Sequence, residues 1–413
     1  MNASHGPAPD DLAAWGAAVL TAVDNREWHT AWNGVLDAAT PLAAPAQRAV
    51  LQRLDEWDAL EAGDEGRRQA VLRQAWQGLQ GELTANVMGA SALDAQDWDR
   101  DWDRDGPAAD RDGSVARYVQ ARGLTKAYAR GGFKLGPVDV RVNPGEILGL
   151  VGENGNGKTT LLRMLAADLQ ADAGSLDWGC DARDVHRLRS QLIYIPQRPP
   201  KWGGRLLDHL AFAARSHGVT GERLHTLVQL VIARLGLRAF RGHAWRQLSS
   251  GYKMRFELAR ALLCAPRVLL LDEPLANLDI NAQQTLLTDL RDMARSPWQP
   301  LALLLSSQQL YEVEKIADQV LFLEQGQPRH VAERFAQMAG SAIEFESPLS
   351  GAALAAKLAG LPAHELAHSG ETRIISFHVA FDASAFLRHA VEVGLPLSYF
   401  RDITRSTRRL FVR

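Results

Sequence analysis

Residues 152–160 form a glycine-rich stretch with the residue types that hold a chain of phosphates. The sequence EILGLV, GENGNGKTT and LLRML reads as a strand, a loop and an amphipathic helix, which is the order of a P-loop. Glycines let backbone N–H groups face phosphate oxygens, and the N-terminus of the following helix adds its positive dipole end. The complete GxxxxGK[ST] pattern therefore predicts a site for ATP and Mg²⁺.

The residues of this loop have separate predicted roles. Lys158 reaches the β- and γ-phosphates, and Thr159 offers its hydroxyl to Mg²⁺. The rest of the stretch surrounds the phosphates, and we expect ATP contacts from Gly152, Glu153, Asn154, Gly155, Asn156, Gly157 and Thr160.

Two adjacent carboxylates follow a second apolar strand. RVLLLDEP places Val268–Leu271 in a buried strand whose end delivers Asp272 and then Glu273. Asp272 faces the metal through a water, and Glu273 faces the water that attacks the phosphate. Acids at a strand end are also compatible with ordinary surface residues, but two acids with separate tasks fit the upstream loop better.

Composition limits the remaining classes of function. The 413 residues predict two or three domains, and a hydrophobic fraction of 46% is that of a globular protein. A net charge of −2 gives no overall field for nucleic acid or anionic lipid. Two isolated cysteines predict neither a disulfide framework nor a metal cluster. No stretch approaches the roughly 18 consecutive apolar residues of a membrane span. If the chain functions at a membrane, we therefore expect another polypeptide to hold it there.

The residue pattern changes twice along the sequence, which divides the chain into three regions. Residues 1–106 contain helical periodicity over 8–91 and a charged, repetitive stretch at 98–106, which we interpret as a linker or, as an alternative, a docking peptide. Residues 117–333 alternate apolar strands with helices, which predicts an α/β P-loop NTPase core with a mainly parallel sheet. The clearest predicted strands are EILGLVG, RVLLLDEP, LALLLSS and QVLFLEQG. Residues 334–413 predict a small α+β domain. The expected fold is thus α/β with an N-terminal all-α module and a C-terminal α+β domain.

A third motif carries a family resemblance. LSSGYKMRFELARALL, at residues 248–263, resembles the signature of ABC ATPases, the nucleotide-binding subunits that power ABC transporters. The family usually has LSGGQ, whereas Ser250 and Tyr252 stand here, a variant similar to that of exporter-type cassettes. The resemblance covers roughly residues 117–330 and rests on five motifs in order. It says little about the first 115 residues.

The resemblance implies further site residues and partners. It assigns Tyr128 to stacking on adenine, Gln197 to the metal and the attacking water, Ser249 and Gly251 to the γ-phosphate of a second chain, and Asn277 and Asp279 to the seam between paired cassettes. The active unit is then a homodimer or heterodimer of cassettes on a polytopic permease at the inner face of the plasma membrane. No nucleic acid is expected. The helical insert at 198–247 receives the permease in this family. Its entrance, RPPKWGG, is interpreted either as a contact with Trp202 as the exposed anchor or as a plain loop.

Gln308 departs from the family pattern. The run LALLLSSQQL ends in a turn that usually carries a histidine, and Gln308 stands in its place. A glutamine amide donates to phosphate without charge, whereas charge-assisted hydrogen bonds are about twice as strong as neutral ones. We expect a slow ATPase, with Glu273, Lys158 and Gln308 as catalytic residues, that powers an exporter. The alternatives are a cassette that scarcely turns over, a soluble ABC ATPase on ribosomes or DNA, and a regulatory nucleotide sensor.

Overall fold

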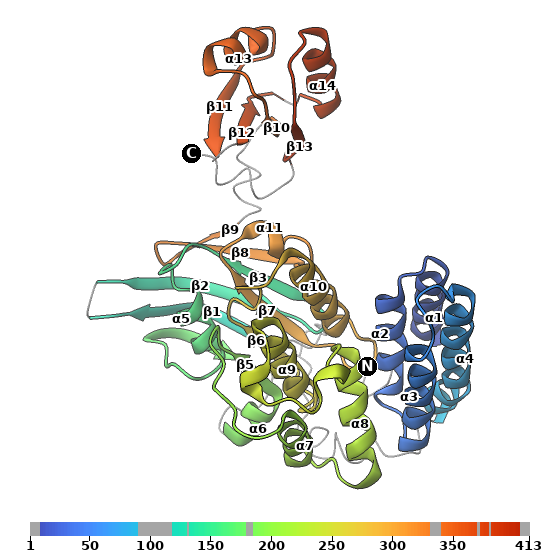
Figure 1. Ribbon diagram of the computed structural model, residues 1–413. Helices are drawn as coiled ribbons and strands as arrows, with labels where there is room; N and C mark the ends of the chain where they lie inside the picture. Colours follow the sequence, from blue (N-terminus) through green and yellow to red (C-terminus); the bar gives the residue numbers. More distant parts are fainter. Residues whose placement is uncertain are drawn as a thin grey trace.

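The computed structural model shows a central α/β body, a helical region toward the N-terminal end of the chain, and a region of helices and strands toward its C-terminal end (Figure 1). The predicted linker at 98–106 lies outside the described residues. Those residues are 9–89, 118–129, 132–178, 185–330, 340–369, 372–379 and 381–404.

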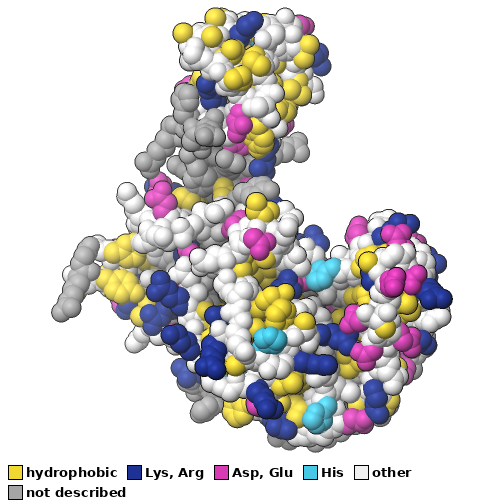
Figure 2. Space-filling view, viewed as in Figure 1, with side chains coloured by type: hydrophobic (Ala, Val, Ile, Leu, Met, Phe, Trp, Pro, Cys, Tyr) yellow, Lys and Arg dark blue, Asp and Glu magenta, His cyan; other side chains and the backbone are white. Residues whose placement is uncertain are grey.

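The described part of the N-terminal region is a helical bundle, drawn in blue in Figure 1. Its interior is aromatic, because Trp32, Trp57 and Trp76 pack among Leu and Val side chains. Acidic and basic side chains are interspersed over its surface (Figure 2). The predicted helical pattern is present as α1 Pro9–Asp24, α2 Trp28–Ala39, α3 Ala44–Asp58 and α4 Glu65–Gly89.

The main sheet of the central body has the strand order β5-β6-β7-β3-β8-β9. Neighbouring strands from β5 to β8 are parallel, and β9 is antiparallel to β8. The strands expected from EILGLVG, RVLLLDEP, LALLLSS and QVLFLEQG are its adjacent members β3, β6, β7 and β8. The bounds are β3 Ile147–Val151, β5 Leu192–Ile195, β6 Val268–Leu271, β7 Ala302–Ser307, β8 Gln319–Glu324 and β9 Gln327–His330.

A smaller antiparallel sheet and several helices complete the central body. The sheet has the order β2-β1-β4 and consists of β1 Val119–Ala127, β2 Lys134–Val142 and β4 Ala173–Asp177. Helices near the main sheet are α5 Lys158–Leu165, α6 Val185–Gln191, α10 Ile280–Ala294 and α11 Leu310–Val313. The expected helical insert at 198–247 contains α7 Leu206–Ser216, α8 Gly221–Arg234 and the short turns Arg238–Phe240 and Trp245–Gln247, and α9 Ser250–Leu262 follows it.

The C-terminal region contains an antiparallel sheet in the order β11-β12-β10-β13, with α13 and α14 packed on it. Phe345, Phe377 and Phe386 lie in the core between sheet and helices. The bounds are β10 Ala342–Glu346, α13 Gly351–Leu358, β11 His364–Ser369, β12 Thr372–Phe377, α14 Ala383–Glu392 and β13 Tyr399–Asp402. Among the described residues, no helix is both long and apolar enough to cross a bilayer.

The bundle docks on two separate parts of the central body. Leu230 of α8 lies in the apolar core of the bundle, and Arg234, one turn later, donates to Asp37 of α2. Asn33 of α2 donates to Asp289 of α10 over 3.1 Å. The bundle therefore contacts the helical insert through α8 and the body of the main sheet through α10.

We propose the domain division 1–106, 117–333 and 334–413 that the sequence predicts. Support comes from separate apolar cores in the bundle, in the central body and in the C-terminal region. Leu230 is shared between the bundle core and α8, so the first two domains join through a packed interface.

The buried ion pair of this interface gives a stability prediction. The Arg234 and Asp37 side chains are 9% and 5% exposed. Arg234→Leu leaves Asp37 buried without its cation, a change that costs about 3 to 5 kcal/mol. Hydrogen exchange of the α2 and α8 amides measures the free energy of opening, which we expect to fall by this amount.

Arg48→Leu is the matched control at the same interface. Arg48 pairs with Glu222 of α8, and the two side chains are 50% and 58% exposed. Exposed pairs contribute about 0 to 1 kcal/mol, so this variant should change protection little. Equal losses in the two variants would contradict the account of the interface.

Candidate nucleotide site

The glycine-rich loop follows β3, all of whose residues are buried, and leads directly into α5. Gly157 is the N-cap of α5 with φ 100°, a left-handed conformation that L side chains rarely adopt. A Cβ atom on Gly152 would lie 2.4 Å from the carbonyl oxygen of Leu323, so a side chain does not fit there. Glu153, Asn154 and Gly155 are exposed at the tip of the loop.

Lys158 lies inside this loop with only 4% of its surface exposed. Its Nζ donates to the carbonyl oxygens of Gly152 and Glu153 over 2.7 and 3.2 Å. The same atom is 3.3 Å from Oε1 of Glu273. The loop therefore encloses the Lys158 ammonium group next to the position where phosphate oxygens would bind.

The Asp272 carboxylate is held by three hydroxyl groups from three elements. Thr159 donates to Oδ2 over 2.7 Å, and Tyr194 of β5 donates to the same oxygen over 3.2 Å. Ser306 of β7 donates to Oδ1 over 2.7 Å. Burial, followed by the charge of Asp272, raises the pKa of Tyr194 further above neutral pH.

The Glu273 carboxylate receives two amide groups on one oxygen. Gln197 donates to Oε2 over 2.9 Å, and Gln308 donates to Oε2 over 2.8 Å. The Lys158 ammonium faces the other oxygen of this carboxylate. The structure therefore brings together the predicted residues Lys158, Glu273, Gln197 and Gln308.

Tyr128, the residue predicted to stack on adenine, lies beside the loop. Its hydroxyl is 3.5 Å from Oγ1 of Thr160, and its side chain is 38% exposed. The Phe133 ring lies 6.4 Å away, centroid to centroid. Sequence analysis did not single out Phe133, because a lone aromatic residue before a strand carries no specific signal.

Oxygen donors suited to Mg²⁺ are present at the same edge. Mg²⁺ is usually held by one or two protein oxygens together with phosphate oxygens and water. Thr159 and Asp272 supply a hydroxyl and a carboxylate in direct contact, so this pair fits the ion.

Comparison with known proteins extends the resemblance. The family model described as "ABC transporter" matches residues 135–276. An ABC transporter ATP-binding protein of Synechocystis is 30% identical over 211 residues, covering 51% of this chain and 72% of the relative. The aliphatic sulfonates import ATP-binding protein SsuB 2 of Xanthomonas axonopodis is 32% identical over 211 residues, covering 50% and 68%. The chain belongs to the ATP-binding proteins of ABC transporters.

Relatives of this ABC ATPase work in different transport systems. "Probable multidrug ABC transporter ATP-binding protein YbhF" of Escherichia coli is 32% identical over 223 residues, covering 52% of this chain and 38% of that protein. Other relatives are named as import proteins. Family membership shows an ATP-binding, ATP-hydrolysing domain of a transporter and leaves the direction of transport to the proposal below.

The residues that the sequence predicts for the signature and for the seam of the ABC ATPase contact one another, and they form a second group beside the residues around the glycine-rich loop. Ser249 is the N-cap of α9 and accepts from the N–H of Tyr252. Ser250 donates to the carbonyl oxygen of Asn277 over 3.0 Å, which ties the signature to the seam. A Cβ atom on Gly251 would lie only 3.2 Å from Cδ2 of Leu278, so the signature backbone approaches this side chain closely.

Asp279 lies in the same group and begins the next helix. It is the N-cap of α10 and accepts from the N–H of Ala282 over 2.9 Å. Among the described residues, the hydrogen bonds of the signature serines reach α9 and the seam, and none reaches residues 152–160.

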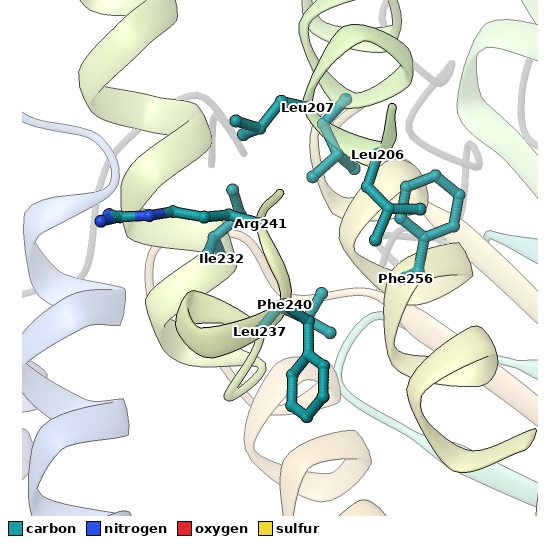
Figure 3. A pocket seen from close by; sticks show the side chains of 8 residues that line it. Leu206, Leu207, Ile232, Leu237, Phe240, Arg241 and Phe256 are labelled. Atoms are coloured by element: carbon teal, nitrogen blue, oxygen red, sulfur yellow. The ribbon is translucent and has the colours of Figure 1, made fainter. Parts of the chain in front are cut away.

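A small hollow in the helical insert lies apart from these residues. Apolar side chains from α7, α8 and α9 surround it, while Arg241 points away from them (Figure 3). Its apolar lining excludes it as a phosphate site. The lining residues are Leu206, Leu207, Leu210, Ile232, Leu237, Phe240, Arg241 and Phe256.

The expectation that Trp202 is an exposed anchor is wrong. Its ring is half-buried against the core of the insert, and its indole N–H donates to the buried Glu257 over 2.5 Å. Arg260 pairs with the same carboxylate and lies over the Trp202 ring. The indole is therefore part of the insert, because the buried carboxylate needs a donor.

The paired amides on Glu273 give a kinetic prediction. Gln308→Ala removes a hydrogen bond to the Glu273 carboxylate, which contributes about 1.5 to 3 kcal/mol, and should slow ATP hydrolysis by roughly ten- to a hundredfold. Gln308→His supplies a donor that can be charged and should raise the rate. Glu273→Gln removes the base and should reduce phosphate release to background.

Gln309→Ala is the matched control, since Gln309 is the exposed neighbour of Gln308 with the same side chain. We expect its rate to equal that of the native chain. Phosphate release by the purified protein, or by its complex with a permease, is the measurement. An unchanged rate in Glu273→Gln would show that this carboxylate is not the base.

Proposed function

We propose that this ABC ATPase powers a transporter by ATP-driven closure of paired cassettes, with the residues assigned above acting in the roles that the sequence predicts. One observation supports this most directly. The residues for binding and hydrolysis gather around Glu273, whereas the exposed signature at Ser249 and Ser250 bonds to its own seam at Asn277. A second cassette would bring a signature to the loop of the first.

The chemistry follows from the geometry around Glu273. Lys158 exchanges its carbonyl and carboxylate partners for phosphate oxygens when ATP enters, because a charged donor prefers the more highly charged anion. This leaves Glu273 free to accept a proton from water. The water oxygen forms a bond to the γ-phosphorus, the bond to the bridging oxygen breaks, and ADP leaves with that electron pair. Bound Mg²⁺ neutralises phosphate charge.

The two amides keep the Glu273 carboxylate in place for this step. Gln197 and Gln308 both donate to Oε2, so they fix the direction in which Oε1 faces. Because an amide stays neutral, Gln308 adds no positive charge to stabilise the transition state. We therefore propose a slow turnover that still depends on Glu273.

A permease and a second cassette are the proposed partners. The chain would reside at the inner face of the plasma membrane through the permease, as a homodimer or with a related subunit. Family membership and the names of the relatives support a transport role. For the direction of transport we propose export, because the signature with Ser250 and Tyr252 resembles that of exporter-type cassettes.

Co-purification from detergent-solubilised membranes tests the transport role. We expect the full-length Glu273→Gln protein, held with ATP and Mg²⁺, to retain a polytopic membrane protein. The native chain without nucleotide should retain less of it, since the closed pair is absent.

The alternatives give different results in the same experiment. Recovery of ribosomes or DNA in place of a membrane protein would favour a soluble ABC ATPase. Recovery of neither, together with ATP binding and no phosphate release, would favour a regulatory nucleotide sensor. Either result would contradict the transport proposal.

A further inference from the structure

The next-to-last residue of β7, Ser306, carries a buried hydroxyl that has so far been given no role in hydrolysis. The strand is buried along its whole length, and Leu303, Leu304 and Leu305 precede Ser306. Ser306 itself is 0% exposed. A hydroxyl in such a position requires hydrogen-bond partners, because an unpaired buried polar group costs about 1 to 3 kcal/mol.

Both partners of Ser306 are the adjacent acids at the end of β6. The Ser306 hydroxyl donates to Oδ1 of Asp272 over 2.7 Å. Its Oγ accepts the backbone N–H of Glu273 over 2.8 Å. One hydroxyl therefore connects the side chain of the metal-side acid with the backbone of the proposed base.

The Glu273 backbone adopts a conformation that needs such support. Its φ is 48°, in the left-handed region that costs a non-glycine residue roughly 1 to 2 kcal/mol. The hydrogen bond from its N–H to Ser306 holds the peptide in this turn. This backbone conformation directs the Glu273 carboxylate toward Gln197, Gln308 and Lys158.

The Asp272 carboxylate is fixed from opposite sides. Thr159 and Tyr194 donate to Oδ2, whereas Ser306 donates to Oδ1. Thr159 belongs to the nucleotide loop and would exchange partners when Mg²⁺ binds. Ser306 lies behind the acids in the sheet, where it can keep its bonds throughout.

We propose that Ser306 is a positioning residue for ATP hydrolysis, acting through Asp272 and Glu273 without touching nucleotide. The inference deepens the proposed function and rests on it. An apolar residue at this position would leave Oδ1 of Asp272 and the N–H of Glu273 without their partner. Both acids would then lose orientation, although the sheet and the loop could remain folded.

A matched pair of substitutions tests the hydroxyl apart from the space it fills. Ser306→Thr and Ser306→Val add side chains of nearly equal shape, and only threonine keeps the hydroxyl. We expect the valine variant to hydrolyse ATP at least tenfold more slowly at saturating ATP, with KM for ATP within twofold of the native value. The threonine variant should stay within threefold of the native rate.

Two further variants serve as a second test of the hydroxyl and as a control. Ser306→Ala removes the hydroxyl without adding volume, so it should behave like valine even if both larger side chains disturb the sheet. Ser296→Ala is the control for loss of a buried serine elsewhere, because Ser296 is 3% exposed and caps Trp298 and Gln299. Its rate should equal that of the native chain.

A binding measurement separates failure of this inference from failure of the proposed function. Fluorescence titration of ATP binding against Mg²⁺ needs no hydrolysis. The alanine and valine variants should need at least threefold more Mg²⁺ for half-maximal binding, and threonine should not. A native chain that never releases phosphate would overturn the proposed function. Alanine and valine variants with native rates and native Mg²⁺ dependence would overturn the role of Ser306.

Discussion

The parallel sheet brings the reacting groups together by placing the carboxyl ends of its strands along one edge. β6, β7 and β3 are neighbours, so the residues that follow them meet although they lie far apart in the sequence. Glu273 follows β6, Gln308 follows β7, and Lys158 lies beyond the loop after β3. Displacing one strand would separate these contacts, and the buried apolar side chains of all three strands prevent that.

Much of this arrangement is predictable from sequence because local patterns encode it. The apolar strands, the glycine-rich loop and the residues at the strand ends repeat a combination with a known physical purpose. The switch from Val and Leu to Asp272 and Glu273 marks where a buried strand reaches an edge. The four predicted strands accordingly occupy adjacent positions in the sheet.

The contacts that sequence analysis missed are those between distant residues. Tyr194 and Ser306 look like ordinary members of apolar strands, and only the strand order shows that both reach Asp272. β11, with the sequence HELAHS, is an edge strand and lacks the apolar alternation that identifies strands. Trp202 looked exposed because the burial of Glu257 is not visible in the sequence.

The N-terminal bundle contacts the cassette through residues that the sequence motifs of the cassette do not predict. Its contacts reach both α8 of the helical insert and α10 of the main body. A movement of the insert relative to the sheet would therefore change the contact between Arg234 and Asp37 unless the bundle moved with the insert. The bundle thus links its own docking to the position of the signature helix α9, which packs beside α8.

The account depends on ATP being held between two cassettes, with the loop of one facing the signature of the other. The most direct measurement is the molar mass by light scattering of the Glu273→Gln protein with ATP and Mg²⁺, alone and with its permease. We predict a nucleotide-dependent pair of cassettes that Ser249→Glu abolishes, because the new carboxylate repels the γ-phosphate. A protein that binds ATP yet stays unpaired under both conditions would contradict the account.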